Sequence, residues 1–271
     1  MIIMQRLLKS VIFGMLLSLL LSGCGAHQPI PLSAVEEYHL YKNAYDQKKY
    51  REAVEGFERF VRIHSGSEFA EAAQFYLAEA HYYQRDYILA STEYRYYLNR
   101  YATSPHAEEA LFKLAMCYYH QSPKSQLDQT ATEVAIRELS RFITKYPNSP
   151  YAEEAEQHRK ECRNKLAKKT YDNGYIYARS LKAYDAAILY YQQVLDLYSD
   201  TDWVDNAQWG IAEAYRKSER WEDARQAYTE LVQMEGVEPK LKERAQAYIL
   251  EMEQHIPDHT VTGINSNATT Y

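Results

Sequence analysis

Glycine and proline are scarce in this chain, which has 9 glycines and 8 prolines among its 271 residues. These two residues interrupt regular structure most often, whereas the helix-favouring alanine, glutamate, leucine and glutamine are abundant here. Long hydrophobic runs are also missing. The mostly apolar stretch 11–21 covers only about half of the ~20 residues that a membrane-spanning helix needs. Beyond residue 23 we therefore expect an almost wholly helical chain.

Basic residues are fewer than acidic ones: the chain has 31 lysines and arginines, 37 aspartates and glutamates, and a formal net charge of −6. Nucleic acid binding requires a basic surface that neutralises phosphates, so nucleic acid is not expected as a partner. Catalytic signals are absent as well, because the sequence has no glycine-rich phosphate loop, no nucleophile elbow and no histidine pair at metal-binding spacing. We expect no enzyme, no metal site and no cofactor.

The stretch "LLLSGCGAHQPIP", residues 19–31, marks a secreted protein. Arg6 and Lys9 are the only charges before it, a short apolar middle follows, and small residues precede Cys24. This order predicts a signal peptide over residues 1–23. Leu21, Ser22, Gly23 and Cys24 also match the bacterial lipobox.

The lipobox match implies that Cys24 is lipidated and becomes the N-terminus, with residues 24–33 as a tether. Two or three acyl chains anchor a protein far more firmly than one. Gly25 follows the cysteine where aspartate would favour retention at the inner membrane, so we expect a lipid-anchored protein on the periplasmic leaflet of the outer membrane. An ordinary signal peptide that contains a cysteine by chance is the alternative.

An internal repeat runs through the remaining chain. Aromatic residues that open similar segments are 37 residues apart, from Tyr50 to Tyr87 and again from Tyr184 to Trp221. Alanine follows three residues later each time and an aromatic seven residues later, which places all three on one helical face. The alanines are Ala53, Ala90, Ala187 and Ala224, and the later aromatics are Phe57, Tyr94, Tyr191 and Tyr228.

Large, small and large apolar residues repeated over two helices form the tetratricopeptide pattern. It predicts an all-α, right-handed superhelical solenoid of five tetratricopeptide-like helix pairs plus a C-terminal capping helix. The expected units are 34–67, 68–104, 105–149, 150–201 and 202–237, followed by a closing helix over 240–256 and a disordered tail over 257–271. Expected N-caps of the first helices are Ser67, Ser104, Ser149 and Thr201.

Two units exceed the common length. The segment "HQSPKSQLDQT" lengthens the turn of the third unit, and the fourth unit carries an insertion without proline, which predicts a first helix extended by about 22 Å with a bend at Gly174. Cys117 and Cys162 occupy equivalent places on successive first helices. Because such helices lie about 8–10 Å apart, we expect both thiols to remain unbridged.

Two rows of aromatic residues recur on the predicted first helices. One row is Tyr38, Phe75 and Phe112, and the other follows it by seven residues at Tyr45, Tyr82 and Tyr119, with Tyr83 beside it. Seven residues are two turns, so both rows share one face, which we expect to be the inner one and to bind an extended peptide with aromatic side chains. Packing in the core is the alternative.

The face changes character in the last two units. Trp209 continues the first row, while Arg179 and Arg216 continue the second and Lys217 lies beside them. An aromatic surface therefore gives way to a basic and mixed one, and we expect these four residues to dock a partner protein.

The lipobox, the five units, the unequal spacings and the segment "YPNSPYAEEAEQHRKECRNKLAKK" together resemble the BamD family, over residues 34–255. This family supplies a lipoprotein of the outer-membrane β-barrel assembly machinery. The resemblance implies that the first three units recognise targeting segments of unfolded outer-membrane proteins. It implies that the last two dock on the periplasmic domains of the barrel insertase, in company with other lipoproteins.

Another periplasmic tetratricopeptide lipoprotein is the alternative reading, as a scaffold for peptidoglycan enzymes or for a pilus secretin. Purification of the complex from detergent-solubilised outer membrane separates the two, because the co-purifying partner differs.

Overall fold

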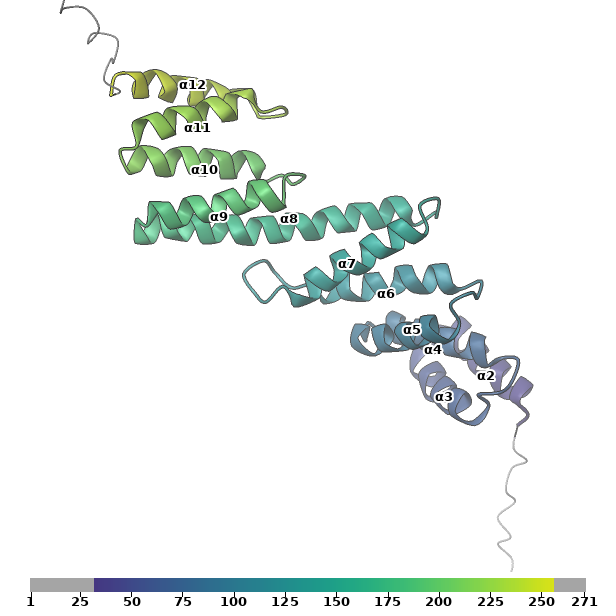
Figure 1. The fold of residues 1–271 in the computed structure, drawn as a ribbon. Coiled ribbons are helices and arrows are strands. Elements are labelled where there is room, and N and C mark those ends of the chain that lie inside the picture. Colours follow the sequence, from purple (N-terminus) through teal and green to yellow (C-terminus); the bar gives the residue numbers. More distant parts are fainter. Residues whose placement is uncertain (1–31, 256–271) are drawn as a thin grey trace, which may run out of the picture.

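The computed structural model describes residues 32–255, so the expected signal peptide, Cys24 and the whole of the expected tail lie outside the described residues. In this part of the chain eleven α-helices and one short π-helix follow one another in a stepped stack (Figure 1). Their bounds are α2 Ala34–Asp46, α3 Tyr50–Ile63, α4 Ala70–Tyr83, α5 Tyr87–Arg100, α6 Ala107–Gln121, α7 Thr130–Lys145, α8 Ala152–Ile176, η1 Tyr177–Leu181, α9 Tyr184–Leu197, α10 Val204–Lys217, α11 Trp221–Gln233 and α12 Pro239–Glu253.

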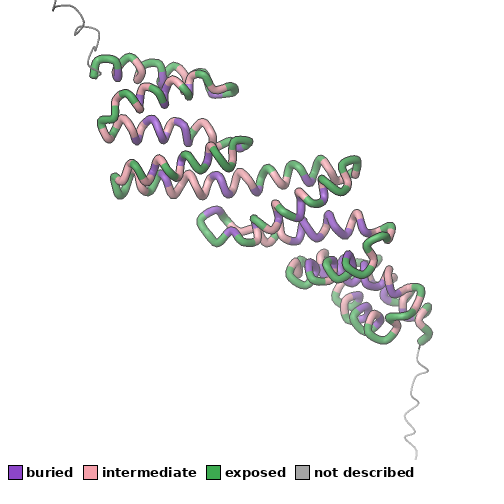
Figure 2. The backbone as a smooth tube through the Cα atoms, in the orientation of Figure 1, coloured by how far each residue is buried: buried purple, intermediate pink, exposed green. Residues whose placement is uncertain are grey.

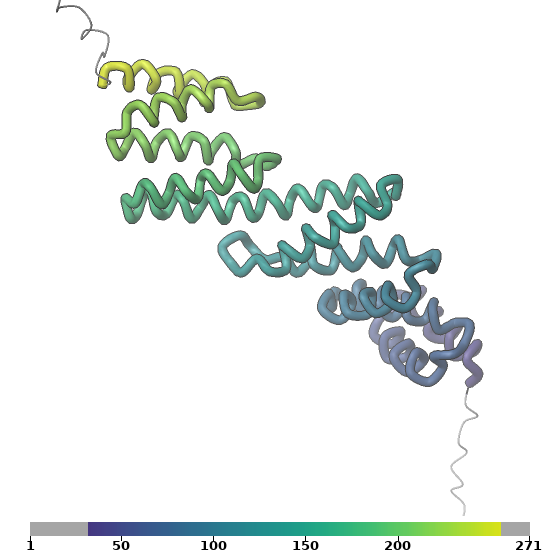
Figure 3. The backbone as a smooth tube through the Cα atoms, viewed as in Figure 1, coloured from purple at the N-terminus to yellow at the C-terminus, as the bar shows by residue number. Residues whose placement is uncertain are grey.

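The helices pack in sequential pairs, from α2 with α3 to α10 with α11, and α12 closes the stack against α11. The chain rises through the stack in order, which Figure 3 shows as a steady change of colour from α2 to α12. The predicted all-α, tetratricopeptide-like fold is confirmed. None of the described helices combines the length and the apolar character that crossing a membrane requires.

Buried residues form a discontinuous core between the helix faces (Figure 2). One cluster fills the first pair and its contact with α4, a second joins α4 to α7, and a third joins α9 to α12. α8 contributes to the second cluster through Ala155, at its start, and to the third through Ala167, near its middle. We call α2–α7 the N-terminal block and α9–α12 the C-terminal block; α8 connects them.

The extended first helix of the fourth unit is present. α8 has 25 residues and continues into η1, whereas α6 has 15 and α10 has 14. Gly174 has a role other than the expected bend: a β-carbon there would lie 2.7 Å from Cε1 of Tyr191. A β-carbon on Gly210 of α10 would come equally close to the same ring, at 2.7 Å from its Cε2. Two glycines thus make room for one buried tyrosine.

The first helices begin three residues after the expected N-caps. Ser104 illustrates the reason: its carbonyl accepts from Ala107 N at 3.0 Å and its hydroxyl accepts from His106 N at 3.1 Å. The residue therefore closes a tight turn that precedes α6 and does not cap the helix itself. Ser67 and Ser149 make equivalent carbonyl bonds, accepting from Ala70 N at 3.1 Å and from Ala152 N at 3.0 Å. Thr201 instead donates its hydroxyl to the carbonyl of Tyr198 at 2.7 Å.

An aromatic stack joins successive units. From the second unit on, the ring of the residue just before each first helix packs against a ring of the preceding first helix, with centroids 4.4–5.0 Å apart. Three of these pairs are stacked and Tyr171–Trp203 is tilted. Phe75 on α4, for example, lies 4.4 Å from His106 with the ring planes 14° apart. Such contacts add to apolar burial and fix the spacing between units. The pairs are Tyr38–Phe69, Phe75–His106, Phe112–Tyr151 and Tyr171–Trp203.

Candidate functional site: an aromatic surface on the first helices

The two predicted aromatic rows have different surroundings. Phe75 and Phe112 are only 3% and 4% exposed, because each is enclosed by its own helix pair and by the stack that joins it to the next unit. Tyr38 is half-buried by Phe57, Phe60 and Phe69. The peptide-binding role expected of Phe75 and Phe112 is therefore corrected: these two rings are packing residues with almost no surface left for a ligand. The role expected of Tyr38 stays a prediction.

The second row lies where successive first helices meet. The Tyr45 ring on α2 lies 5.0 Å from Tyr76 on α4. The Tyr82 hydroxyl on α4 lies 3.2 Å from Nε2 of His120 on α6. We call Tyr45, Tyr82 and Tyr119, together with the neighbouring rings of Tyr76, Tyr83 and His120, the tyrosine surface.

Tyr119 continues this pattern from α6 to α8. Its hydroxyl donates to Glu161 at 2.6 Å, and its ring centroid lies 4.1 Å from that of His158. Burial, assisted by the bond to the Glu161 carboxylate, raises the pKa of Tyr119 to about 12. The hydroxyl therefore stays protonated and donates at neutral pH, as a fixed polar group among rings.

A buried carboxylate lies beneath the tyrosine surface. Glu79 on α4 is 3% exposed and accepts hydrogen bonds from the hydroxyls of Tyr94 and Tyr45, the second at 3.1 Å. Burial, followed by the charge of Glu79, raises the pKa of both tyrosines well above its usual range. A carboxylate out of water costs free energy unless it is hydrogen-bonded and charge-balanced, so Glu79 needs a nearby cation.

Lys113 on α6 supplies that cation. Its Nζ lies 4.4 Å from the centroid of the Tyr82 ring and 4.9 Å from that of Tyr83. Burial by itself lowers the pKa of Lys113, but Glu79 and Tyr83 outweigh it and the pKa is raised. The lysine is thus held charged over two aromatic faces, which is a favourable cation–π arrangement. Lys42 lies similarly over Tyr76, at 4.7 Å.

The tyrosine surface offers both exposed rings and fixed charges. Tyr83 is 45% exposed and stacks on Tyr50 of α3 with centroids 5.2 Å apart. Exposed rings over charged and hydroxyl groups can bury the aromatic side chains of an extended peptide and bond to its backbone. Within residues 32–255 no cluster of three metal-ligating side chains occurs.

The expected docking residues fall into two places. Trp209, Arg216 and Lys217 share α10. The Trp209 ring packs against Tyr228 and Tyr248, with centroids 5.3 and 5.7 Å away. Arg179 lies instead on η1, where its guanidinium is 5.8 Å from the Tyr175 ring.

The basic residues of α10 are partly neutralised within the chain. Nε and Nη2 of Arg216 donate to the two carboxylate oxygens of Glu213, each at 3.1 Å, and its guanidinium lies 4.7 Å over the Tyr248 ring. Lys217 lies 3.8 Å from the same carboxylate and is exposed. Of the predicted docking residues, Arg179 and Lys217 therefore keep the most surface.

Sequence reasoning did not single out Glu79, Lys113 or Tyr76. Glu79 and Tyr76 lie on the same helix as Phe75 and Tyr82, at spacings that place them beside the rows. A charged residue inside the apolar segment "AQFYLAEAHYY" was the available signal for Glu79, because a lone acid in such a stretch is a candidate for burial with a partner.

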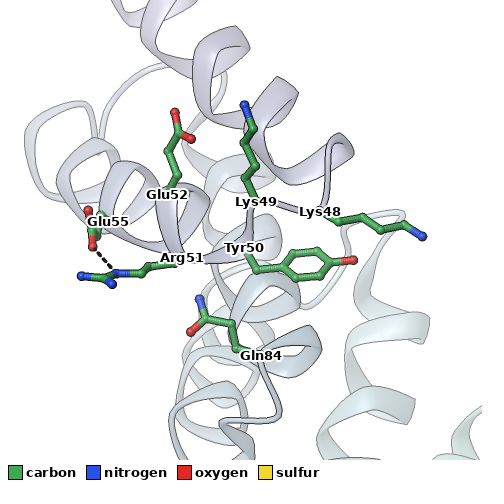
Figure 4. A pocket seen from close by; sticks show the side chains of 7 residues that line it. All are labelled: Lys48, Lys49, Tyr50, Arg51, Glu52, Glu55 and Gln84. Carbon is green, nitrogen blue, oxygen red and sulfur yellow. Dashed lines mark hydrogen bonds and ion pairs between the residues drawn. The ribbon is translucent and has the colours of Figure 1, made fainter.

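A hollow of about 590 Å³ lies at the turn between α2 and α3, apart from the tyrosine surface (Figure 4). Its lining includes Lys48, Lys49 and Arg51, and the side chains of the two lysines point out from the turn. Tyr50 links this hollow to the tyrosine surface, through its stack on Tyr83 and an edge contact with Tyr45 at 5.7 Å.

Cys117 and Cys162 are buried and unbridged, as predicted. Burial raises the pKa of the Cys162 thiol to about 11 and that of Cys117 further still. Neither is a nucleophile at neutral pH.

Three solved structures of tetratricopeptide proteins are similar to this chain. TTC0263 of Thermus thermophilus is 18% identical, with 80% of this chain and 100% of that one covered and a TM-score of 0.34. A protein of Parabacteroides merdae is 15% identical, with coverages of 83% and 80% and a TM-score of 0.35. The TPR2AB domain of yeast Sti1, solved in complex with pHSP90, is 14% identical, with coverages of 82% and 88% and a TM-score of 0.39.

No curated protein matches the sequence. A family model described as "Outer membrane lipoprotein" matches residues 32–231, which is most of the chain and nearly all of its helical stack. It represents a non-catalytic group of assembly lipoproteins. The chain therefore belongs to the YfiO family of outer membrane lipoproteins, which is the BamD family that its sequence resembles.

Proposed function

We propose that this protein is a lipid-anchored scaffold of the outer-membrane β-barrel assembly machinery, held by Cys24 on the periplasmic leaflet of the outer membrane. It binds targeting segments of unfolded outer-membrane proteins with its N-terminal block and docks on the barrel insertase with its C-terminal block. Family membership together with the tyrosine surface carries this proposal.

The tyrosine surface supports the binding role of the N-terminal block. It presents Tyr83 and the edges of Tyr45, Tyr82 and Tyr119 along three successive first helices. Lys113 and Lys42 lie against these rings. Each is balanced by a carboxylate of the chain, Lys113 by Glu79 and Lys42 by Asp46 at 2.6 Å, so they serve a peptide as hydrogen-bond donors to its carbonyls. Rings of this kind contribute a large share of the binding energy in protein interfaces.

The C-terminal block supports docking on a folded partner. Lys217 and, in part, Arg216 and Trp209 present charge and aromatic area on α10, and Arg179 adds a further charge on η1, just before the block. Both elements pack against α8 and α9. Charged residues at the rim of an interface set partner choice and association rate.

Purification from detergent-solubilised outer membrane tests the scaffold role. The mature chain with an affinity tag after residue 271 should bring down a large barrel insertase and other lipoproteins. Recovery of a pilus secretin or a peptidoglycan hydrolase without the insertase would establish the alternative scaffold. The variant Arg179→Glu with Lys217→Glu should lose the insertase, and Glu222→Lys, an exposed charge change on α11, is its matched control.

Peptide capture tests the N-terminal role separately. The variant Tyr83→Ala with Tyr119→Ala should bind a peptide with alternate aromatic residues at least about tenfold more weakly, because two aromatic contacts are lost. Tyr96→Ala on α5 is the control, since Tyr96 is 52% exposed and lies outside the tyrosine surface. Equal affinity for both variants and for the unchanged protein would refute binding at this surface.

A further inference from the structure

A groove between α3, α4 and α5 has no part in the proposed function. It encloses about 520 Å³, and Arg62 and Arg100 line it, so we call it the arginine groove. Gln74 of α4 also lines it, whereas Tyr83, nine residues later on the same helix, belongs to the tyrosine surface. At 100° per residue these two residues point to opposite sides of α4. The arginine groove therefore faces away from the surface to which we assign peptide binding.

Two arginines from different helices meet in the arginine groove. Arg62 lies in the last turn of α3 and Arg100 in the last turn of α5. Both are exposed, and within residues 32–255 neither forms an ion pair with a carboxylate. Arg59, three residues before Arg62, differs in this respect, because it pairs with Glu37 at 2.9 Å. The groove thus holds two guanidinium groups that remain available to a ligand.

Arg100 is held in position by the ring that follows it. Its Nε donates to the hydroxyl of Tyr101 at 3.2 Å, and its guanidinium lies 5.7 Å from the centroid of that ring. The Tyr101 ring in turn packs against Tyr97, which is fully buried, with centroids 5.4 Å apart. Because the bond uses Nε, both terminal nitrogens of Arg100 can donate to a ligand. A side chain that is already fixed also loses less conformational entropy on binding.

The other polar groups of the groove also favour an anionic ligand. Glu93 is the one carboxylate that the described residues contribute to its lining, and it accepts from the amide of Gln74 at 2.7 Å. Ser65, Tyr96 and Tyr101 add hydroxyl groups that can donate. The lining therefore combines two guanidinium groups and three hydroxyls with a single carboxylate that already has a partner.

A simpler explanation covers only part of this arrangement. Cations in the last turn of a helix are favoured by the helix dipole, and Lys145 at the end of α7 follows the same rule. The dipole accounts for a cation on each helix. It does not account for two arginines that line one groove together with hydroxyl donors, and this combination is what indicates a ligand.

We propose that the arginine groove binds an acidic peptide segment of a partner protein. Carboxylates of the segment pair with Arg62 and Arg100, since the guanidinium fork matches a carboxylate. Val61 and Tyr96, which is 52% exposed, offer apolar surface that a compact phosphate would leave uncovered. A volume of about 520 Å³ is within the range of ligand-binding pockets. This site goes beyond the proposed function and lets a second protein bind while the tyrosine surface is occupied.

Peptide titration of the full chain, purified from detergent-solubilised membranes, tests the site. The probe is a fluorescent hexapeptide of alternating glutamate and valine, and its neutral counterpart has glutamine in place of glutamate. We expect the acidic probe to bind at least about tenfold more tightly at low salt, because hydrogen bonds to charged groups are the stronger ones. The difference should shrink as salt is added, since exposed charges are screened.

Charge reversal locates the site. Arg62→Glu with Arg100→Glu should abolish the preference for the acidic probe. Lys48→Glu with Lys49→Glu is the matched control, because it reverses as many charges at exposed lysines of the separate hollow at the α2–α3 turn and should leave the preference in place. Arg62→Lys with Arg100→Lys keeps the charge without the fork and should weaken binding several-fold. Circular dichroism checks that each variant keeps its helices.

Three outcomes would overturn the proposal. The first is equal affinity for the two probes, and the second is an equal loss in the lysine control, which would mean that overall charge alone attracts the probe. The third is displacement of the probe by phosphatidylglycerol vesicles more readily than by unlabelled peptide, which would assign the groove to a lipid headgroup. Tyr83→Ala with Tyr119→Ala should leave binding of the acidic probe unchanged, so failure of the tyrosine surface is recognised separately.

Discussion

The N-terminal and C-terminal blocks are built from the same repeat but join their aromatic rings in different ways. In the N-terminal block rings contact rings from one first helix to the next, as Tyr45 contacts Tyr76 and Tyr82 contacts His120. In the C-terminal block arginines cover the rings: Arg244 lies 4.5 Å over Trp209, and Arg216 lies 4.7 Å over Tyr248. The first arrangement leaves rings at the surface, and the second leaves guanidinium groups.

This difference shows how one repeat can serve two kinds of partner. Helix positions are fixed by a small residue in every unit and a large buried side chain four residues later, such as Ala53 and Phe57 or Ala224 and Tyr228. In the third unit the large residue is Leu139. The positions beside them are free to vary without loss of the fold. Because each unit contacts only its neighbours, the two blocks can also differ in stability, with α8 as the element that couples them.

The largest effect is expected from a substitution that destabilises the C-terminal block and leaves the N-terminal block nearly unchanged. Tyr191 is 2% exposed, and its ring fits between Gly174 of α8 and Gly210 of α10. We expect Tyr191→Ala to destabilise the C-terminal block by about 3–5 kcal/mol, since a large buried ring is replaced by a cavity. Hydrogen exchange measured by mass spectrometry should show faster exchange in α9–α12 and little change in α2–α5.

Tyr191→Phe is the matched control, because it keeps the ring and should cost far less. Uniformly faster exchange from α2 to α12 in Tyr191→Ala would show that the blocks unfold as one unit, and the division between them would fail.

A smaller effect is expected at the buried charge of the N-terminal block. Glu79→Gln keeps the size of the side chain but removes the charge that balances Lys113 and one acceptor for Tyr45 or Tyr94. We expect a loss of about 2 kcal/mol in the free energy of unfolding of this block. The pKa of Lys113, followed by NMR, should fall, because its burial would no longer be offset.

Glu109→Gln provides the comparison, since Glu109 lies near Lys113 but is less enclosed. An unchanged Lys113 pKa in Glu79→Gln would mean that Tyr83, and not Glu79, holds the lysine charged.

In the C-terminal block we expect a smaller loss of stability when the charge of Arg216 is removed. Arg216→Gln removes two bonds to Glu213 and the contact with Tyr248, at a partly exposed site where ion pairs contribute little. We expect a loss of about 1 kcal/mol, measured by urea unfolding. Arg216→Lys keeps the charge but not the paired bonds, so it should recover only part of that loss. Full recovery would show that charge alone matters here.

The sequence predicted the helix pairs well because their signal is local. Alanine three residues after an opening aromatic lies on the same helical face wherever the helix packs, and the extra residues of the fourth unit had no breaker and so lengthened a helix. The same register placed Cys117 and Cys162 on successive first helices, so their unbridged state could be predicted as well.

The depth of each ring could not be predicted in the same way. Spacing places Phe75 and Tyr82 on one face of α4, but what covers them comes from the next unit: His106 stacks fully on Phe75, whereas His120 only meets the edge of Tyr82. Contacts between Glu79 and Tyr45 join residues 34 apart. Such pairings depend on how successive helices are placed, which periodicity within one helix does not contain.

The smallest expected effect concerns pH and the tyrosine surface. His120 stacks on Tyr87 at 4.6 Å, and burial, then His158, Arg85 and Lys113, lower its pKa below the ordinary 6.5. The unfolded chain therefore binds this proton more readily than the folded one. The contribution of His120 to stability is present above pH 6.5 and is lost as the pH falls below it.

Urea unfolding at a series of pH values between 5 and 8 measures this dependence, and His120→Gln should flatten it, because glutamine carries no titrating proton. Arg85→Gln should flatten it partly, since one of the three positive neighbours is removed and His120 then accepts its proton more easily in the folded chain. A slope that His120→Gln leaves unchanged would place the titrating group elsewhere. A slope lost in His120→Gln but unaltered in Arg85→Gln would mean that burial sets the pKa and that the charges around the tyrosine surface act on one another only weakly.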